Sequence, residues 1–258
     1  MSIFSITIQH WAAWIPGISS RADWQLWLQG EKLTQAGATP DLVQIPALLR
    51  RRLSPLGKMA LSVAWSVIPS AETKLSAVFA SRHGELERTV AMLQSIAAAE
   101  TASASTLSPT QFSLSVHNAI GGVHSIARKD FSAITALAVG DEGLNLALME
   151  AGLILAESEA GQALCVIYDE PLPEPYSDPR VGPARPFALA LIVSRNDLAA
   201  DGSVRLTLNL VEKDEVEQQR DELQALSFIR YLLTPEQESL WLPGLRHDWC
   251  WTRSGGAV

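Results

Sequence analysis

The sequence predicts an α/β fold, because segments with helical periodicity alternate with short apolar runs along its 258 residues. Ser132–Val139, Leu144–Glu157 and Gln162–Tyr168 have the patterns of a strand, a helix and a strand, which predicts a parallel crossover. Hydrophobic residues make up 47% of the chain, enough for a core that needs no disulfide staple.

The N-terminal part is predicted to begin with a strand. Phe4–Trp14 is apolar and partly β-branched, and Pro16-Gly17 ends it. Helical spacing of apolar residues, or a short apolar run, then predicts a helix at Asp23–Gly30, a helix at Pro46–Val67, a strand at Ser76–Ala80 and a helix at Glu85–Ala99. Pro55 marks either a kink or the true start of the second helix.

The middle of the chain contains two predicted loops and one further helix. Glu100–Pro109 is rich in Thr, Ser and Ala, and Pro171–Pro186 holds six prolines. Asn118–Arg128 is predicted to be helical, with Asn118 at the N-cap.

The last third is predicted to add two strands and a charged helix. Pro186–Ser194 is a buried strand, and we expect Val204–Val211 to pair with it. Glu215–Leu233 has the pattern of a charged helix. Packing anchors are expected at Trp241, Trp249 and Trp251.

Composition excludes several classes of function. Twenty basic and 28 acidic side chains give a net charge of −8, which argues against nucleic-acid binding. Cys165 and Cys250 form no CxxC pair, and Cys165 lies in an apolar run, so we expect buried thiols in a reducing compartment. The first residues lack a signal-peptide pattern, and no apolar run is long enough for a membrane span. We therefore expect a cytoplasmic protein.

The usual catalytic motifs are missing from the sequence. It has no glycine-rich phosphate loop and no GxSxG nucleophile elbow. His117 and His124 would share a face if both were helical, but no carboxylate or thiolate lies at metal-ligand spacing, so no metal site is expected. Asp141 and Glu142 precede a predicted helix, where capping and the helix dipole explain carboxylates.

One combination of segments resembles a known family. Ser108–Ile126 reads SPTQFSLSVHNAIGGVHSI, the predicted crossover follows it and ends at Tyr168-Asp169-Glu170, and LLRRRLSPLGKMAL (Leu48–Leu61) precedes it. This order resembles the N-terminal half of β-ketoacyl synthases, and in particular the short chain-length-factor-type proteins of bacterial aryl polyene clusters. The resemblance implies a thiolase-like fold, mainly its N-terminal half, over residues 1–195. Residues 196–258 would be a short, truncated or divergent C-terminal extension packed on it within a single domain.

The sequence departs from this family at the nucleophile. In an active ketosynthase the strand ends in a cysteine at a helix N-terminus, which lowers the thiol pKa. The register implied by the resemblance places Leu137 there, and no residue from Ala136 to Gly140 is nucleophilic. Thr135 is the nearest hydroxyl, and no adjacent residue could be its base. We therefore expect no catalytic residue and no activity.

A second departure lies in the C-terminal part. Catalytic ketosynthases carry two histidines and a lysine in their C-terminal half. His247 is the only histidine after His124, and its surroundings, GLRHDWCW, do not match a ketosynthase motif. The decarboxylation residues are therefore expected to be absent as well.

The resemblance implies a non-catalytic subunit that pairs with a complete ketosynthase in type II polyketide or aryl polyene synthesis. The nucleophile-bearing strands of two subunits lie beside each other in that fold, so the expected partner interface comprises Ser132, Ile134, Thr135, Ala136 and Leu137. The residues expected to line or close the partner's acyl channel are Phe112, Leu114, Val116 and His117. An acyl carrier protein would be an indirect partner, and no cofactor is implied.

Other interpretations remain open at this stage. Phe112 and Val116 would equally suit an ordinary core, and His117 could simply hydrogen-bond its own loop. Arg50–Arg52 could meet an acidic carrier protein, stay solvated or form an internal salt bridge. Ser115 and His117 would share one side of a strand and could serve an acyltransferase with an unrecognised nucleophile. A homodimeric protein that binds acyl-carrier species is a further alternative.

Overall fold

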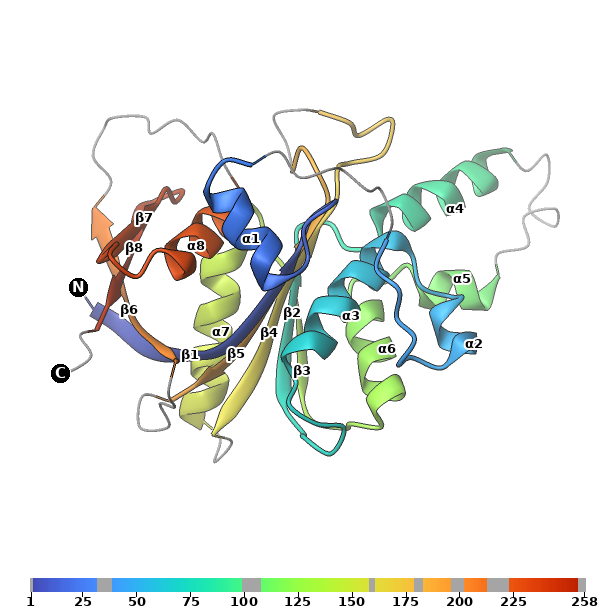
Figure 1. Cartoon of the computed structure of the whole chain (residues 1–258). Helices are drawn as coiled ribbons and strands as arrows, with labels where there is room; N and C mark the ends of the chain where they lie inside the picture. The colour runs from blue at the N-terminus through green and yellow to red at the C-terminus, as the bar shows by residue number, and fades with distance from the viewer. Residues whose placement is uncertain are drawn as a thin grey trace.

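The protein is an α/β structure with helices on both faces of one sheet, as expected (Figure 1). The computed structural model describes residues 2–31, 39–98, 108–157, 161–178, 183–195, 202–212 and 223–254. Within these ranges the sheet has eight strands in the order β3-β2-β4-β5-β1-β6-β8-β7.

The elements follow the predicted order closely. The strands are β1 (Ser2–Trp14), β2 (Ser76–Ser81), β3 (Ile134–Ala138), β4 (Gln162–Asp169), β5 (Phe187–Ser194), β6 (Val204–Glu212), β7 (Ser239–Leu242) and β8 (His247–Arg253). The helices are α1 (Arg21–Leu28), α2 (Ala47–Arg50), α3 (Pro55–Val67), α4 (Leu86–Ala98), α5 (Pro109–Ser113), α6 (Ala119–Arg128), α7 (Gly143–Glu157) and α8 (Gln224–Leu233).

The predicted crossover is confirmed. β2 pairs in parallel with β3 on one side and with β4 on the other, so the connection from β3 through α7 to β4 passes over β2. All other neighbouring strands are antiparallel. The carboxyl ends of β2, β3 and β4 therefore meet at one edge of the sheet, where α/β proteins usually place their chemistry.

Side chains alternate along the buried strands between two cores. In β4, Cys165 points into the core on the α7 and α8 side, whereas Val166 points into the core on the α3 and α6 side. Period-two alternation with both faces apolar is what continuous runs such as LCVIY require when helices cover both faces. Cys165 is completely buried, as expected, and burial raises the pKa of its thiol.

The helix expected over Pro46–Val67 is two helices. α2 ends at Arg50, and α3 begins at Pro55 after Ser54, whose extended backbone suits the residue before proline. The Ser54 hydroxyl accepts a hydrogen bond from the Gly57 N–H, and proline loses nothing at the first helical position. Of the two alternatives for Pro55, the true helix start is correct.

The expected pairing of Val204–Val211 with the preceding strand is wrong. β6 pairs with β1 and β8, because β4 and β1 already occupy both edges of β5. β8 and β7 then extend the same sheet. Trp249 and Trp251 are buried as predicted, whereas Trp241 is half-exposed and is not a core anchor.

Parts of four predicted elements lie outside the described residues. These parts are residue 99 of the helix predicted at Glu85–Ala99, residues 100–107 of the first loop, residues 179–182 of the proline-rich loop and residues 215–222 of the charged helix. No helix in the described ranges has the length and apolar character needed to cross a bilayer.

His124 on α6 is a buried histidine with an unusual environment. Its ring lies 5.1 Å from that of Trp65 and 5.3 Å from that of Phe79, and its Nδ1 has no hydrogen-bond partner. Burial, with a smaller contribution from the Arg128 charge, lowers its pKa to about 4. The ring is therefore neutral in the folded protein at neutral pH.

We expect His124 to make folding stability depend on pH. The imidazole of the unfolded chain binds a proton below about pH 6.5, whereas the folded one does so only near pH 4. The stability associated with the neutral ring is full above pH 6.5 and falls by about 3 kcal/mol as the pH drops to 4. Urea denaturation of the wild type and of His124→Phe measures this, because every other titrating group is common to both proteins. Parallel stability curves for the two proteins between pH 6.5 and 4 would contradict the assignment.

Candidate functional site

The candidate site lies at the carboxyl ends of the three parallel strands. These ends are Ser81 of β2, Ala138 of β3 and Asp169 of β4, and the connection from β3 to α7 runs beside them. The edge of β3 that faces away from β2 pairs with no other strand among the described residues.

Leu137, expected at the nucleophile position, lies inside β3, and α7 begins only at Gly143. The backbone at this point is not the sharp strand-to-helix turn that exposes a nucleophile to a helix N-terminus. Its carbonyl oxygen lies 2.8 Å from His117 Nε2, so that nitrogen is the donor. The position therefore offers an apolar side chain and a carbonyl that is already hydrogen-bonded.

Thr135 has an acidic neighbour that is not adjacent in sequence. The Thr135 hydroxyl donates to Glu150 Oε1 of α7 at 3.2 Å. The two residues lie far apart in sequence, and only the packing of α7 against the sheet brings them together. Thr135 nevertheless lies in mid-strand, away from any helix N-terminus that would stabilise an oxyanion.

His117 and Gly84 fit each other closely. Gly84, in the turn after β2, has φ +57°, and a Cβ built on it would lie 2.8 Å from His117 Nδ1. Its N–H donates to the Ser81 hydroxyl. Glycine is thus required both by its left-handed backbone and by the imidazole, which is held between this turn and β3.

The two acids before α7 have specific partners. Asp141 forms a 2.7 Å ion pair with Arg82, which joins the β3–α7 connection to the end of β2. Glu142 Oε1 accepts hydrogen bonds from the Leu245 N–H and the Trp249 indole. Glu142 therefore binds the C-terminal segment. The sequence analysis had explained this carboxylate by helix capping and did not predict the contact.

Two further acids at this edge were not predicted as site residues. Asp169 Oδ1 accepts hydrogen bonds from the Ser81 hydroxyl and the Arg82 N–H, both at 2.8 Å, and burial raises its pKa to about 6. Burial, with repulsion from Glu87 and other acids, raises the pKa of Glu170 to about 7. The available sequence signal was their position directly after the buried run that became β4.

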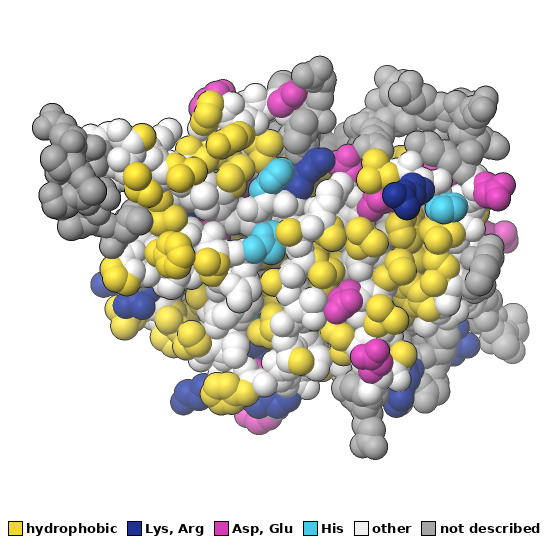
Figure 2. All heavy atoms as spheres, turned by 180° about the vertical axis from the view of Figure 1, so that it is seen from behind, with side chains coloured by type: hydrophobic (Ala, Val, Ile, Leu, Met, Phe, Trp, Pro, Cys, Tyr) yellow, Lys and Arg dark blue, Asp and Glu magenta, His cyan; other side chains and the backbone are white. Residues whose placement is uncertain are grey.

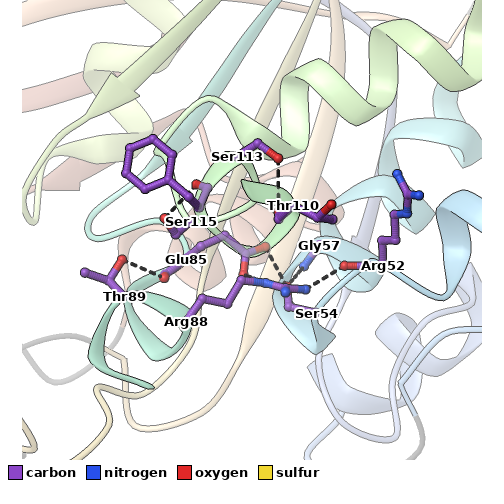
Figure 3. A network of polar contacts seen from close by, with 10 residues as sticks. Arg52, Ser54, Gly57, Glu85, Arg88, Thr89, Thr110, Ser113 and Ser115 are labelled. Atoms are coloured by element: carbon purple, nitrogen blue, oxygen red, sulfur yellow. Dashed lines mark hydrogen bonds and ion pairs between the residues drawn. The ribbon is translucent and has the colours of Figure 1, made fainter. Parts of the chain in front are cut away.

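A buried carboxylate links the start of α3 to the start of α4 (Figure 3). Glu85 accepts a hydrogen bond from the Ser54 hydroxyl at 2.7 Å and pairs with Arg88 Nε at 2.8 Å. Arg88 also donates to the carbonyl of Arg52. Arg50 donates to the Leu42 carbonyl, whereas the side chains of Arg51 and Arg52 are exposed, so the basic run is anchored at one end and solvated at the other.

The residues expected to line an acyl channel do not all lie in one environment. Phe112 is 59% exposed and Val116 is 38% exposed, so the alternative that they are ordinary core residues is wrong. Leu114 packs against the core on the α3 side, and His117 reaches β3.

The proposed pairing of Ser115 with His117 on a strand is also wrong. The segment is the turn between α5 and α6, and the Ser115 hydroxyl donates to the Phe112 carbonyl (Figure 3). The expected interface residues Ile134, Thr135, Ala136 and Leu137 lie in the edge strand β3, all partly exposed. Ser132 precedes the strand, and its hydroxyl donates to Asp130.

The described residues contain no group of three or more His, Cys, Asp or Glu side chains arranged to hold a metal ion. His117 contacts β3, while His124 is enclosed by Trp65 and Phe79. The two imidazoles therefore have separate environments.

The family profile and the solved structures point to one family. The family profile described as "Beta-ketoacyl synthase, N-terminal domain" matches residues 24–252. The comparison with curated proteins found no significant match. Among solved structures, a ketosynthase (ApeO) in complex with its chain length factor (ApeC) from Xenorhabdus doucetiae contains a chain 26% identical to this one, with a TM-score of 0.77. The alignment covers 97% of this chain and 100% of that one.

Two more distant structures are similar in fold. The ishigamide ketosynthase/chain length factor has 16% identity and a TM-score of 0.60, covering 81% of this chain and 67% of that one. A β-ketoacyl synthase from Burkholderia phymatum STM815 has 10% identity and a TM-score of 0.59, covering 89% and 70%. The expected thiolase-like fold is confirmed, and the matched chains of these two structures extend beyond the region they share with this chain.

We expect Gly84→Ala to reveal the contact with His117. The left-handed backbone alone costs roughly 1–2 kcal/mol, and the clash with the imidazole raises the loss of folding free energy to about 3 kcal/mol. Gly30→Ala is the matched control, because Gly30 also has a positive φ but nothing within 4 Å of an added Cβ. Urea denaturation should show the excess cost of Gly84→Ala disappearing in a His117→Ala background. Equal losses for the two glycine variants in the wild-type background would contradict the contact.

Proposed function

Because the chain belongs to the family of β-ketoacyl synthase N-terminal domains, we propose that it is a non-catalytic subunit that pairs with an active β-ketoacyl-ACP synthase. Its role would be that of a chain length factor in type II polyketide or aryl polyene synthesis. The β3–α7 connection carries the proposal: the strand and the helix are present, but no cysteine or serine lies between Ala136 and Gly143. An acyl chain has no thiol to attach to at this position.

The edge of β3 supports pairing with another subunit. An edge strand presents unpaired backbone groups, and proteins usually cover, charge or distort such an edge. Here apolar side chains flank it instead: Phe131, 91% exposed, and Ile126 on the α6 side, and Leu153 on the α7 side. The face seen from behind carries broad hydrophobic patches with few charged side chains between them (Figure 2). This is the character of a surface that a protein partner covers.

The segment from Phe112 to His117 would act on the partner's acyl channel. Phe112 and Val116 are exposed apolar side chains on a short segment whose position is fixed by the contact between His117 and β3. If β3 lies beside the partner, this segment lies close to the same interface. Its bulk would then limit the length of a chain that stays attached to the partner's cysteine and to an acyl carrier protein.

Co-expression with ketosynthases encoded beside this chain tests the pairing. We expect a 1:1 complex by affinity purification and light scattering. Phe131→Glu should weaken it at least tenfold, because a buried unpaired carboxylate costs several kcal/mol. Val43→Glu is the matched control, since Val43 is 74% exposed and lies before α2. A homodimer or monomer that binds no ketosynthase would contradict the proposal, and so would Phe131→Glu retaining the affinity of Val43→Glu.

The contact between Thr135 and Glu150 favours one second candidate, an acyltransferase that uses the Thr135 hydroxyl. Intact-mass measurement after incubation with acyl thioesters separates the two functions. The proposal predicts an unmodified mass for this subunit and acylation of the ketosynthase alone. An acyl adduct on the wild type that is lost in Thr135→Val would establish the second candidate.

A further inference from the structure

A cavity of about 580 Å³ lies at a corner of the sheet away from the carboxyl ends of the parallel strands. The pairing of β1 with β6 ends at Ile8, opposite Val204, whereas its pairing with β5 continues to Trp14. The register of β1 shifts at the same point, between Ile8 and His10. Beyond Ile8 the β6-facing edge of β1 therefore has no strand partner among the described residues, and the cavity opens there.

The walls of this cavity combine apolar and basic groups. Ile8, Val67, Val204 and Leu232 supply apolar surface, and His10 and Arg21 supply nitrogen donors. Among the described residues that line it none is acidic, although the chain carries 28 acidic side chains and a net charge of −8. A cavity of this volume, in which polar groups converge beside apolar side chains, is large enough for a small molecule.

Arg21 is held in place without a carboxylate. Its guanidinium lies 4.6 Å above the Trp11 ring, and no ion pair with an acidic side chain is found for it in the described part of the chain. Stacking on an aromatic face orients a guanidinium and leaves its N–H fork available. That fork matches a carboxylate in bidentate geometry, which a neutral ligand cannot exploit.

From these observations we infer that the cavity binds a small organic carboxylate with an apolar or aromatic body. The carboxylate would lie between Arg21 and His10 at the rim, and the apolar body would pack against Ile8 and Val67 inside. The site is separate from the residues that the proposed function uses. It can therefore be tested whether or not that proposal holds.

Calorimetric titration with 2-naphthoate, and with 2-naphthalenemethanol as its neutral counterpart, tests the site. We expect the carboxylate to bind about tenfold more tightly than the alcohol, because a charge-assisted pair is lost in the alcohol. Arg21→Gln should weaken naphthoate binding about tenfold, while Arg51→Gln, an exposed arginine beside α2, should leave it unchanged. The indole N–H signal of Trp11 should shift with naphthoate.

Two results would overturn the inference. One is equal affinity for naphthoate and the alcohol, which would indicate an apolar hollow without anion recognition. The other is unchanged naphthoate affinity in Arg21→Gln. If circular dichroism shows that Arg21→Gln is unfolded, His10→Gln replaces it, with the same expected loss and the same contradicting result.

Discussion

Helix α7 packs one side against the sheet, and one of the two cores is built around it. Ala147, Leu148 and Ala151 are fully buried in the core between this helix and the sheet. The C-terminal segment adds to this core: the Trp251 indole donates to Asn145, which in turn donates to Gln224 of α8. Burying the amide of Asn145 is tolerated because it is hydrogen-bonded on both sides.

The same packing holds the carboxyl ends of the three parallel strands in place. His117 donates to the Leu137 carbonyl of β3. Arg82, after β2, pairs with Asp141 in the β3–α7 connection, and its N–H donates to Asp169 at the end of β4. Glu142 joins the connection before α7 to Trp249, so the C-terminal segment and the candidate site support each other. These side chains hold the strand ends and their turns in place. Both cysteines in the described residues are buried, so no accessible thiol lies beside them. This arrangement supports the proposed role, in which the subunit shapes a partner's channel.

Much of the fold could be predicted from the sequence, because strands buried on both faces appear in it as continuous apolar runs. Continuous apolar runs identified β4 and β5, and Pro55 identified the start of α3 as one of two options. The neighbour of β6 could not be predicted, since pairing depends on which strand edges are already occupied. The partner of Thr135 was missed because Glu150 approaches only through the crossover. Asp169 and Glu170 were missed because their perturbed pKa values arise from burial at a strand end, which periodicity does not report.

Coverage of the edge strand β3 by a partner is central to the proposed pairing. Hydrogen exchange of the Ile134–Ala138 amides, measured for the protein alone and in complex with a ketosynthase, tests this directly. The account predicts fast exchange for the amides that face away from β2, and slowing by at least tenfold in the complex, because an added strand would bond them. A complex that forms and leaves the exchange of this strand unchanged would contradict it.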